Sequence, residues 1–207
     1  MTQLFQIHTD NPQKRLISQA AECLNGGGVI VYPSESGYAL GCHLGDKKAL
    51  DRVRAIRQLD DKHNFTLMCK DLSEIASYAR VDNDLYRLLK QHTPGPYTFI
   101  LNATKDVPRR LLHPKRKAIG IRVSENKICH ALLAEFAEPL ISTTLIMPGE
   151  DMPMTDPYDI RDTLASQVDL VIDGGFCGFE PTSVINLTDD EVEIIREGAG
   201  DVSAFQY

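Results

Sequence analysis

An unbroken apolar run at residues 29–32 follows three glycines and predicts a strand buried on both faces. Pro33 has no amide hydrogen to donate, so we expect this strand to end there. Three polar residues, 34–36, come next, and the glycine-bounded segment 37–41 is expected to turn the chain back. Polar side chains at the carboxyl end of a buried strand are where open α/β sheets bind ligands. An ordinary strand-to-loop exit carries the same residue types, so this pattern alone leaves both interpretations open.

Apolar positions at helical spacing predict a helix before this strand, with Asn11 as N-cap and Pro12 at the first helical position. Glycines 26–28 end that helix. Asp46 is expected to cap the next helix, and Asp71, Asp82 and Asn126 to start three more. Short helices are expected at 108–113 and 159–164. Further strands are expected at residues 65–69, 97–101, 118–123, 139–144, 168–172, 182–187 and 192–196.

Helices and strands alternate early in the chain, and strands dominate late. This order predicts an α/β fold with a twisted open sheet of parallel and antiparallel strands, in a single domain spanning residues 1–207. Segment 145–158 holds several chain breakers and is expected to be a long loop, with a lid as one interpretation.

Composition is that of a globular protein, with 43% hydrophobic residues. The sequence has no basic-plus-apolar leader and no apolar run near 18 residues, so we expect a cytoplasmic protein without a membrane partner. Its five cysteines are odd in number and widely spaced. Buried thiols in a reducing compartment are the expected state, and a catalytic cysteine is the minor alternative.

Charge is unevenly distributed along the chain. Residues 47–122 hold 17 Lys and Arg against 8 Asp and Glu, a net +9, whereas the remainder holds 5 against 21, a net −16. A basic middle in an acidic protein favours an anionic partner over the alternative of solvated helix faces.

Common site motifs are missing from the sequence. It contains no phosphate loop of the GxxxxGK[ST] type, no GxGxxG after the strand and no nucleophile elbow. The six histidines include no HxxxH pair, so no metal site is expected. A Ser-His-Asp triad stays open, because such triads are assembled in space rather than in sequence.

Polar groups at strand ends and in basic loops are the remaining candidates. The expected nucleotide or substrate site comprises Ser34, Ser36, Arg57, Lys62, His63, Arg122, Ser142, Thr144, Ser183 and Arg196. The arginines suit phosphate through their planar donor fork. The expected RNA-binding residues form a dense basic segment of Lys105, Arg109, Arg110, Lys115, Arg116 and Lys117. Binding of a phosphate backbone needs charge rather than a motif, and a solvated hairpin is the alternative.

Several blocks, in order and spanning nearly the whole chain, resemble the YrdC/YciO family, which includes the threonylcarbamoyl-AMP synthases of tRNA modification. Residues 32–41, YPSESGYALG, look like the family's YPTETVYGLG, and residues 93–98, TPGPYT, look like WPGPxT. Residues 119–122 resemble its strand ending in VR, residues 139–143 match PLxST, residues 181–185 resemble STVVD, and residues 196–198 look like RxG. Taken together, the sequences of these blocks resemble the YciO branch of the family most.

The resemblance implies a twisted mixed sheet with a large, concave, positively charged cavity. Active members condense L-threonine, bicarbonate and ATP to threonylcarbamoyl-AMP and pyrophosphate, and the family is associated with double-stranded RNA and tRNA. By position, Ser34 would lie where the threonine pocket begins. Arg122, Ser183 and Arg196 would lie along the nucleotide side.

Two departures from the family pattern bear on activity. Active members carry KxR where this chain has Arg57-Gln58-Leu59, and SxN where it has Thr144-Leu145-Ile146. Leu59 and Ile146 thus replace an arginine and an asparagine, and each lost hydrogen-bond partner costs roughly 1–3 kcal/mol. Arg57 is no substitute for the missing lysine, since a guanidinium differs from an ammonium in shape and donors. Lys62 and His63 are the candidates to compensate.

We therefore expect a YciO-type protein that binds nucleotide (ATP or AMP) and double-stranded RNA or tRNA in a basic cavity, with absent or weak synthase activity. The first alternative is an active, nucleotidyltransferase-type synthase of tRNA threonylcarbamoyladenosine formation, with L-threonine as substrate and Mg²⁺ accompanying ATP. A second alternative is an acyl or carbamoyl phosphate hydrolase that uses the same pocket.

Overall fold

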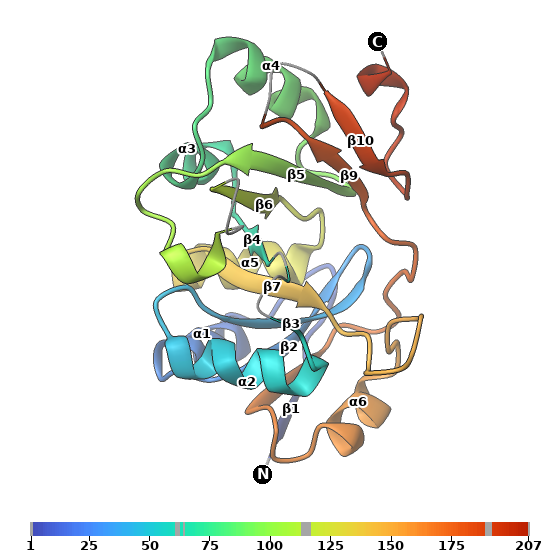
Figure 1. Ribbon diagram of the computed structural model, residues 1–207. Coiled ribbons are helices and arrows are strands. Elements are labelled where there is room, and N and C mark those ends of the chain that lie inside the picture. The colour runs from blue at the N-terminus through green and yellow to red at the C-terminus, as the bar shows by residue number, and fades with distance from the viewer. Residues whose placement is uncertain (1, 61–62, 64, 113–116, 189–191, 207) are drawn as a thin grey trace.

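One ten-stranded sheet organises the chain, in the order β1-β8-β2-β3-β7-β4-β6-β5-β9-β10 (Figure 1). We analysed a computed structural model, which describes residues 2–60, 63, 65–112, 117–188 and 192–206. The strands are β1 (Gln3–Gln6), β2 (Ile30–Ser34), β3 (Gly37–His43), β4 (Thr66–Met68), β5 (Tyr97–Asn102), β6 (Ala118–Arg122), β7 (Leu140–Thr144), β8 (Leu170–Asp173), β9 (Ser183–Asn186) and β10 (Glu193–Arg196). The β1–β8, β8–β2, β4–β6 and β5–β9 pairs are parallel and the others antiparallel. The expected mixed α/β sheet is confirmed.

Six α-helices connect the strands within the described part of the chain: α1 (Lys14–Asn25), α2 (Lys47–Arg57), α3 (Leu72–Tyr78), α4 (Asn83–His92), α5 (Lys127–Phe136) and α6 (Pro157–Thr163). The side chains of Asp46, Asp71, Asp82 and Asn126 cap helices as expected, each accepting from backbone amides of the first turn. Across the described residues, no helix has the length and apolar character needed to span a membrane.

Three local predictions were wrong. Strand β2 continues through Pro33 to Ser34, because its neighbour β8 pairs only with Ile30 and Val31 and leaves Pro33 with one partner strand. Residues 37–41 form strand β3 rather than a turn, and the chain reverses at residues 35–36. Helix α1 begins after Gln13, so Asn11 is not its N-cap.

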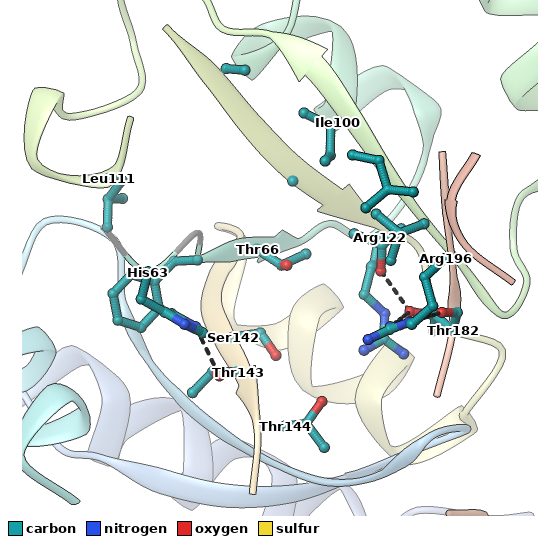
Figure 2. A pocket seen from close by; sticks show the side chains of 16 residues that line it. His63, Thr66, Ile100, Leu111, Arg122, Ser142, Thr143, Thr144, Thr182 and Arg196 are labelled. Atoms are coloured by element: carbon teal, nitrogen blue, oxygen red, sulfur yellow. Dashed lines mark hydrogen bonds between the residues drawn. The ribbon is translucent and has the colours of Figure 1, made fainter. Parts of the chain in front are cut away.

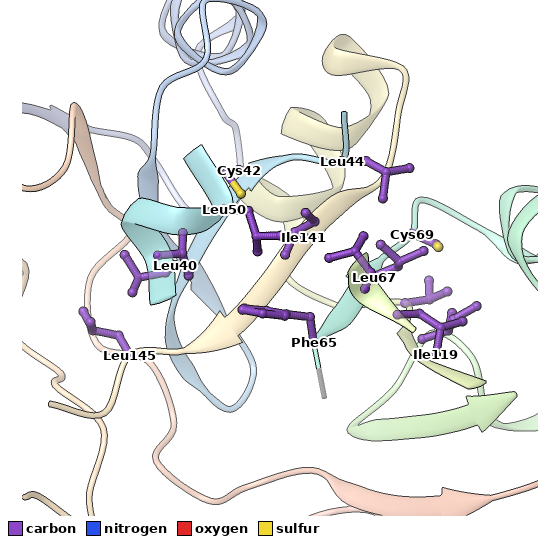
Figure 3. Close-up of a cluster of buried hydrophobic side chains, with 14 of the residues drawn as sticks. Leu40, Cys42, Leu44, Leu50, Phe65, Leu67, Cys69, Ile119, Ile141 and Leu145 are labelled. Carbon is purple, nitrogen blue, oxygen red and sulfur yellow. The ribbon is translucent and has the colours of Figure 1, made fainter. Parts of the chain in front are cut away.

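Two cores cover the faces of the sheet, and alternate residues of β2 point into each. Val31 belongs to the larger core, which also receives Leu50 from α2 and is drawn in part in Figure 3. Ile30 and Tyr32 belong to the smaller core, which α1 and α5 complete. The two-residue period of a strand accounts for this division.

The face that carries the smaller core also carries a row of small residues. Successive strands from β2 to β5 place Ile30, Gly41, Ser142, Thr66, Gly120 and Ile100 opposite one another. The four middle positions of this row are glycine, serine or threonine, so their side chains fill little of the space above the sheet. A cavity opens over this part of the face.

Candidate functional site

The cavity has a volume of about 470 Å³ and is shown in Figure 2. It is lined by His63, Phe65, Thr66, Thr98, Ile100, Leu111, Ala118, Gly120, Arg122, Ser142, Thr143, Thr144, Thr182, Val184, Ile195 and Arg196. Strands β4, β5, β6, β7, β9 and β10 all contribute to it. The site is therefore assembled by sheet register rather than by any continuous segment.

Part of the cavity floor is fixed by a close approach of Tyr32 to Gly41. A Cβ atom on Gly41 would lie 2.7 Å from the Tyr32 ring, so only glycine lets the ring pass. The buried Tyr32 hydroxyl then donates a 2.7 Å hydrogen bond to the Ser142 hydroxyl. Gly41 on β3 thus lets Tyr32 of β2 reach across to β7, where its hydroxyl orients a cavity-lining serine.

Arg122 is a buried cation at the end of β6. Its Nη2 donates to Glu35 Oε1 at 2.5 Å and to Ser36 Oγ at 2.9 Å, both in the turn between β2 and β3. The Ser124 hydroxyl donates to the second oxygen of Glu35. Arg122 Nε is buried and has no hydrogen-bond partner, so this guanidinium has donor capacity left over.

Arg196 is the second cation of the cavity. Its Nε and Nη2 donate to the Thr182 carbonyl at 2.9 and 2.7 Å, which fixes one edge of the guanidinium. The Thr182 hydroxyl in turn lies 2.8 Å from the Thr98 hydroxyl. Burial first, and then the charge of Arg122, lower the pKa of Arg196 from its ordinary value. The two guanidiniums therefore repel each other across the same space.

Positive charge in the cavity exceeds negative charge. None of the described residues that line the cavity is Asp or Glu. The carboxylate of Glu35, which is outside the lining, forms an ion pair with Arg122. Figure 2 shows Arg122 and Arg196 together at one side of the cavity. Two guanidiniums with one engaged carboxylate form a site for an anion, and their planar donors suit phosphate or carboxylate oxygens.

His63 lies at the opposite side of the cavity from the arginines (Figure 2). Its Nε2 is 3.4 Å from the Thr143 hydroxyl, and its ring packs edge-on against Phe65. Burial first, then the charge of Arg57, lower its pKa, with Arg54 adding to the effect and Asp60 opposing it. The imidazole is therefore held neutral at physiological pH.

The cavity walls differ in polarity. One part of the wall is aliphatic. It is formed by the side chains of Ile100 on β5, Leu111 in the segment that precedes β6, Val184 on β9 and Ile195 on β10. Hydroxyl groups of Ser142, Thr143, Thr144, Thr66 and Thr98 line the other part. A ligand with an anionic end, a flat apolar part and hydrogen-bonding groups matches this distribution.

The structure gathers half of the ten residues expected at this site. Arg122, Ser142, Thr144, Arg196 and His63 line the cavity. Ser34, Ser36, Arg57 and Ser183 do not line it, and Lys62 lies outside the described residues.

The four described residues that do not line the cavity make other contacts. Ser34 Oγ donates to the Gly37 carbonyl, Ser36 supports Arg122, and Ser183 Oγ donates to the Gly200 carbonyl. Arg57, at the end of α2, reaches the site through its charge on His63.

Glu35 was not among the predicted site residues. A charged residue in a two-residue turn is usually solvated, so the sequence gives no sign that Glu35 pairs with Arg122. Thr182, like Ser183, is a polar candidate at a strand end, and it is Thr182 that lines the cavity.

The two residues that depart from the family pattern lie outside the cavity lining. Leu59 packs against the larger core, and Ile146 forms an isolated bridge with Pro153. Neither brings a polar group to the cavity.

Thiols and metal ligands do not form a site in the described part of the chain. Burial raises the pKa of Cys42 and Cys129 to about 12 and that of Cys23 and Cys177 to about 11, so these thiols stay protonated and are poor nucleophiles. No group of three or more His, Cys, Asp or Glu able to hold a metal occurs among the described residues.

A separate hollow, which we call the outer groove, gathers part of the predicted RNA-binding segment. It has a volume of about 640 Å³, and Arg80, Lys105, Arg109 and Lys117 line it with four smaller or apolar residues. Arg110 points elsewhere, donating to the Leu44 carbonyl at 2.9 Å. Lys115 and Arg116 lie outside the described residues.

Comparison with known proteins identifies the family. Residues 22–198 match the family model named for Sua5, YciO and YrdC and described as "Telomere recombination". Escherichia coli YciO is 58% identical over 205 residues, covering 99% of this chain and 100% of that protein. Its crystal structure has a TM-score of 0.95 with this chain and covers 100% of both.

More distant relatives bear the name of an enzyme. A threonylcarbamoyl-AMP synthase of Coxiella burnetii is 29% identical over 76% of this chain and 84% of its own length. Sua5 of P. abyssi, solved with L-threonine, is 20% identical with a TM-score of 0.87 over 95% of this chain and 58% of that one, a likeness of fold. With most of its length matched by the family model and a relative at 58% identity, the chain belongs to the Sua5/YciO/YrdC family.

Proposed function

We propose that the protein binds a nucleotide, ATP or AMP, in the cavity and RNA on its basic surface, with threonylcarbamoyl-AMP synthase activity absent or weak. The observation that carries the nucleotide part is the pair of guanidiniums, Arg122 and Arg196, which face one space with a single carboxylate already engaged. An anion that enters between them relieves their repulsion and satisfies the free Nε of Arg122.

The walls of the cavity support a nucleotide over a simple anion. In this proposal the phosphates bind at the arginine side, and the base packs against the aliphatic surface that Ile100, Val184 and Ile195 supply. The hydroxyls of Ser142 and Thr144 are available to ribose or to a second substrate. Mg²⁺ enters as the counter-ion of ATP, because the described residues offer no carboxylate cluster of their own.

The positions of Leu59 and Ile146 support the proposed loss of synthase chemistry. Synthesis of an acyl adenylate needs charge stabilisation at the reacting phosphate and exact placement of the second substrate. Here one of the two positions serves the core and the other a loop bridge. The protein keeps an anion site while lacking two groups that the family uses.

RNA binding is supported by the charge of residues 47–122, a net +9, and by the four cations of the outer groove. Double-stranded RNA or tRNA is the proposed partner class.

An active synthase is the second candidate. Its support is the hydroxyl-rich wall of the cavity, together with synthases at 29% identity among the relatives. L-threonine has a carboxylate for an arginine and a hydroxyl for Ser142 or Thr143, so it is the candidate second ligand.

Titration of MgATP by calorimetry tests the cavity. Arg196→Ala removes one guanidinium and should lower the affinity roughly tenfold or more, since charge-assisted hydrogen bonds to phosphate are strong. Arg161→Ala is the matched control, because Arg161 pairs with Asp162 on α6 and does not line the cavity. Equal affinity in wild type and Arg196→Ala would contradict nucleotide binding at this site.

A further inference from the structure

We infer that the outer groove, and not the cavity, is where the phosphodiester backbone of RNA binds, with Arg80 as a contact residue. This inference rests on the proposed function and specifies the RNA site within it. It assigns the two kinds of phosphate to two places, nucleotide to the cavity and polymer backbone to the groove.

Backbone hydrogen bonds preorganise the cations of the groove. Ala103 forms a bridge with Ala79, and Arg80 N donates to the Asn102 carbonyl at 2.8 Å. On its other side, Ala103 N donates to the Lys117 carbonyl at 3.0 Å. Arg80 and Lys117 therefore flank one strand end, and their positions are set by the main chain rather than by flexible loops.

The groove holds uncompensated charge. Arg80, Lys105, Arg109 and Lys117 are exposed, and none of them has an ion-pair partner within the described residues. Asp106 is the adjacent carboxylate, and it does not line the groove. Four like charges around one hollow repel one another, and a polyanion relieves that repulsion while releasing its counter-ions.

One wall separates the groove from the cavity. Leu111 and Ala118 line the cavity, whereas Arg109 and Lys117 of the same segment line the groove. The 3₁₀ turn Arg109–Leu111 carries this division, since Arg109 lines the groove and Leu111 lines the cavity. Arg196 lines the cavity and not the groove.

Exposure of the four cations favours a polymer backbone over a free nucleotide. The four exposed side chains come from separate segments and can contact successive phosphates along a strand, whereas the cavity sets Arg122, which is buried, and Arg196 around one small space. The uncharged lining residues are Ala103, Thr104, Val107 and Leu112, and the one hydroxyl among them, that of Thr104, already donates to the Ser77 carbonyl. Binding should thus be independent of sequence.

The test separates the two sites with two pairs of variants. Lys105→Glu/Arg109→Glu reverses two groove charges, and Lys47→Glu/Lys48→Glu makes the same change in total charge at the exposed start of α2. Binding of a 24-base-pair RNA duplex and of a tRNA transcript is measured by fluorescence anisotropy from about 50 to 200 mM salt. MgATP affinity is measured in the same proteins, and circular dichroism checks their folding.

We expect the groove variant to lose roughly tenfold or more in RNA affinity, with a shallower salt dependence, by about 0.9 in the log–log slope per lost contact on duplex. The start-of-α2 control should change RNA affinity less than threefold, and both should bind MgATP like wild type. The single variant Arg80→Ala should lower RNA affinity, and Arg196→Ala should leave it unchanged.

Equal RNA loss in the control pair would overturn the groove assignment while leaving RNA binding itself intact. Loss of RNA binding in Arg196→Ala would place the RNA in the cavity and also overturn it. If wild type binds neither RNA, the RNA part of the proposed function fails, and the groove assignment fails with it.

Discussion

At the residue scale, the pairing of Glu35 with Arg122 is the contact on which the anion site depends most. The side chains of Arg122 and Glu35 are 6% and 15% exposed, so removing the carboxylate leaves a nearly buried cation without its partner. Glu35→Ala should lower the free energy of unfolding by about 3 kcal/mol. Urea denaturation measures this loss, with the exposed Glu125→Ala as control. A loss below about 1 kcal/mol would mean that cavity water stabilises Arg122 unaided.

His63 makes stability depend on pH. Its pKa in the folded protein lies below the ordinary 6.5, so the unfolded chain takes up a proton that the folded chain resists. The stability that neutral His63 provides is complete above pH 6.5 and falls as the pH drops below it. Unfolding of wild type and His63→Asn from pH 8 to 5.5 should show wild type losing more stability over this window. A difference that stays constant with pH would contradict the burial of a neutral imidazole.

At the element scale, the pairing register of the strands determines which side chains line the cavity. Gly41 is opposite Ser142 in this register and is also packed against the Tyr32 ring. A Cβ at this position would lie 2.7 Å from the Tyr32 ring, so Gly41→Ala must displace the ring and break its bond to Ser142. We expect a loss of about 1–3 kcal/mol in urea unfolding, and weaker MgATP binding as well.

Gly26→Ala is the matched control for this substitution, because its Cβ would meet ordinary contacts at 3.5 Å and its φ is −78°. Its stability should change by less than about 0.5 kcal/mol. Equal effects of the two substitutions would show that the Gly41 position is not sterically special.

Elements were predictable where periodicity and capping agree. Helices α2, α3, α4 and α5 follow an Asp or Asn cap, and that signal is local. Strand β1 was missed, since its two outer residues are exposed, its two inner residues are only half-buried, and it has no longer apolar run. The prediction that β2 ends at Pro33 was wrong because a proline is tolerated in a strand where the neighbouring strand does not pair with it. How far β8 extends along β2 is set by the tertiary structure and not by the local sequence.

At the scale of the whole molecule, positively charged side chains gather in two separate places, the cavity and the outer groove. The basic middle of the sequence predicted an anionic partner but not that one wall would divide the cations between a cavity and a groove. Arg122 and Arg196 were expected at a site because they end predicted strands and suit phosphate, and the family resemblance assigned them to the nucleotide side. The contact of Arg122 with Glu35 joins residues 87 positions apart, so spacing alone gave no means to derive it.

Pyrophosphate release from MgATP distinguishes an anion site without synthase chemistry from an active synthase. The reaction contains L-threonine and bicarbonate, with and without tRNA, and MgATP binding is measured in the same preparation. We predict MgATP binding that Arg196→Ala weakens, and no threonine-dependent release of pyrophosphate. Threonine-dependent release that is lost in Arg196→Ala would show instead that the protein is an active synthase and that Leu59 and Ile146 are compatible with that activity.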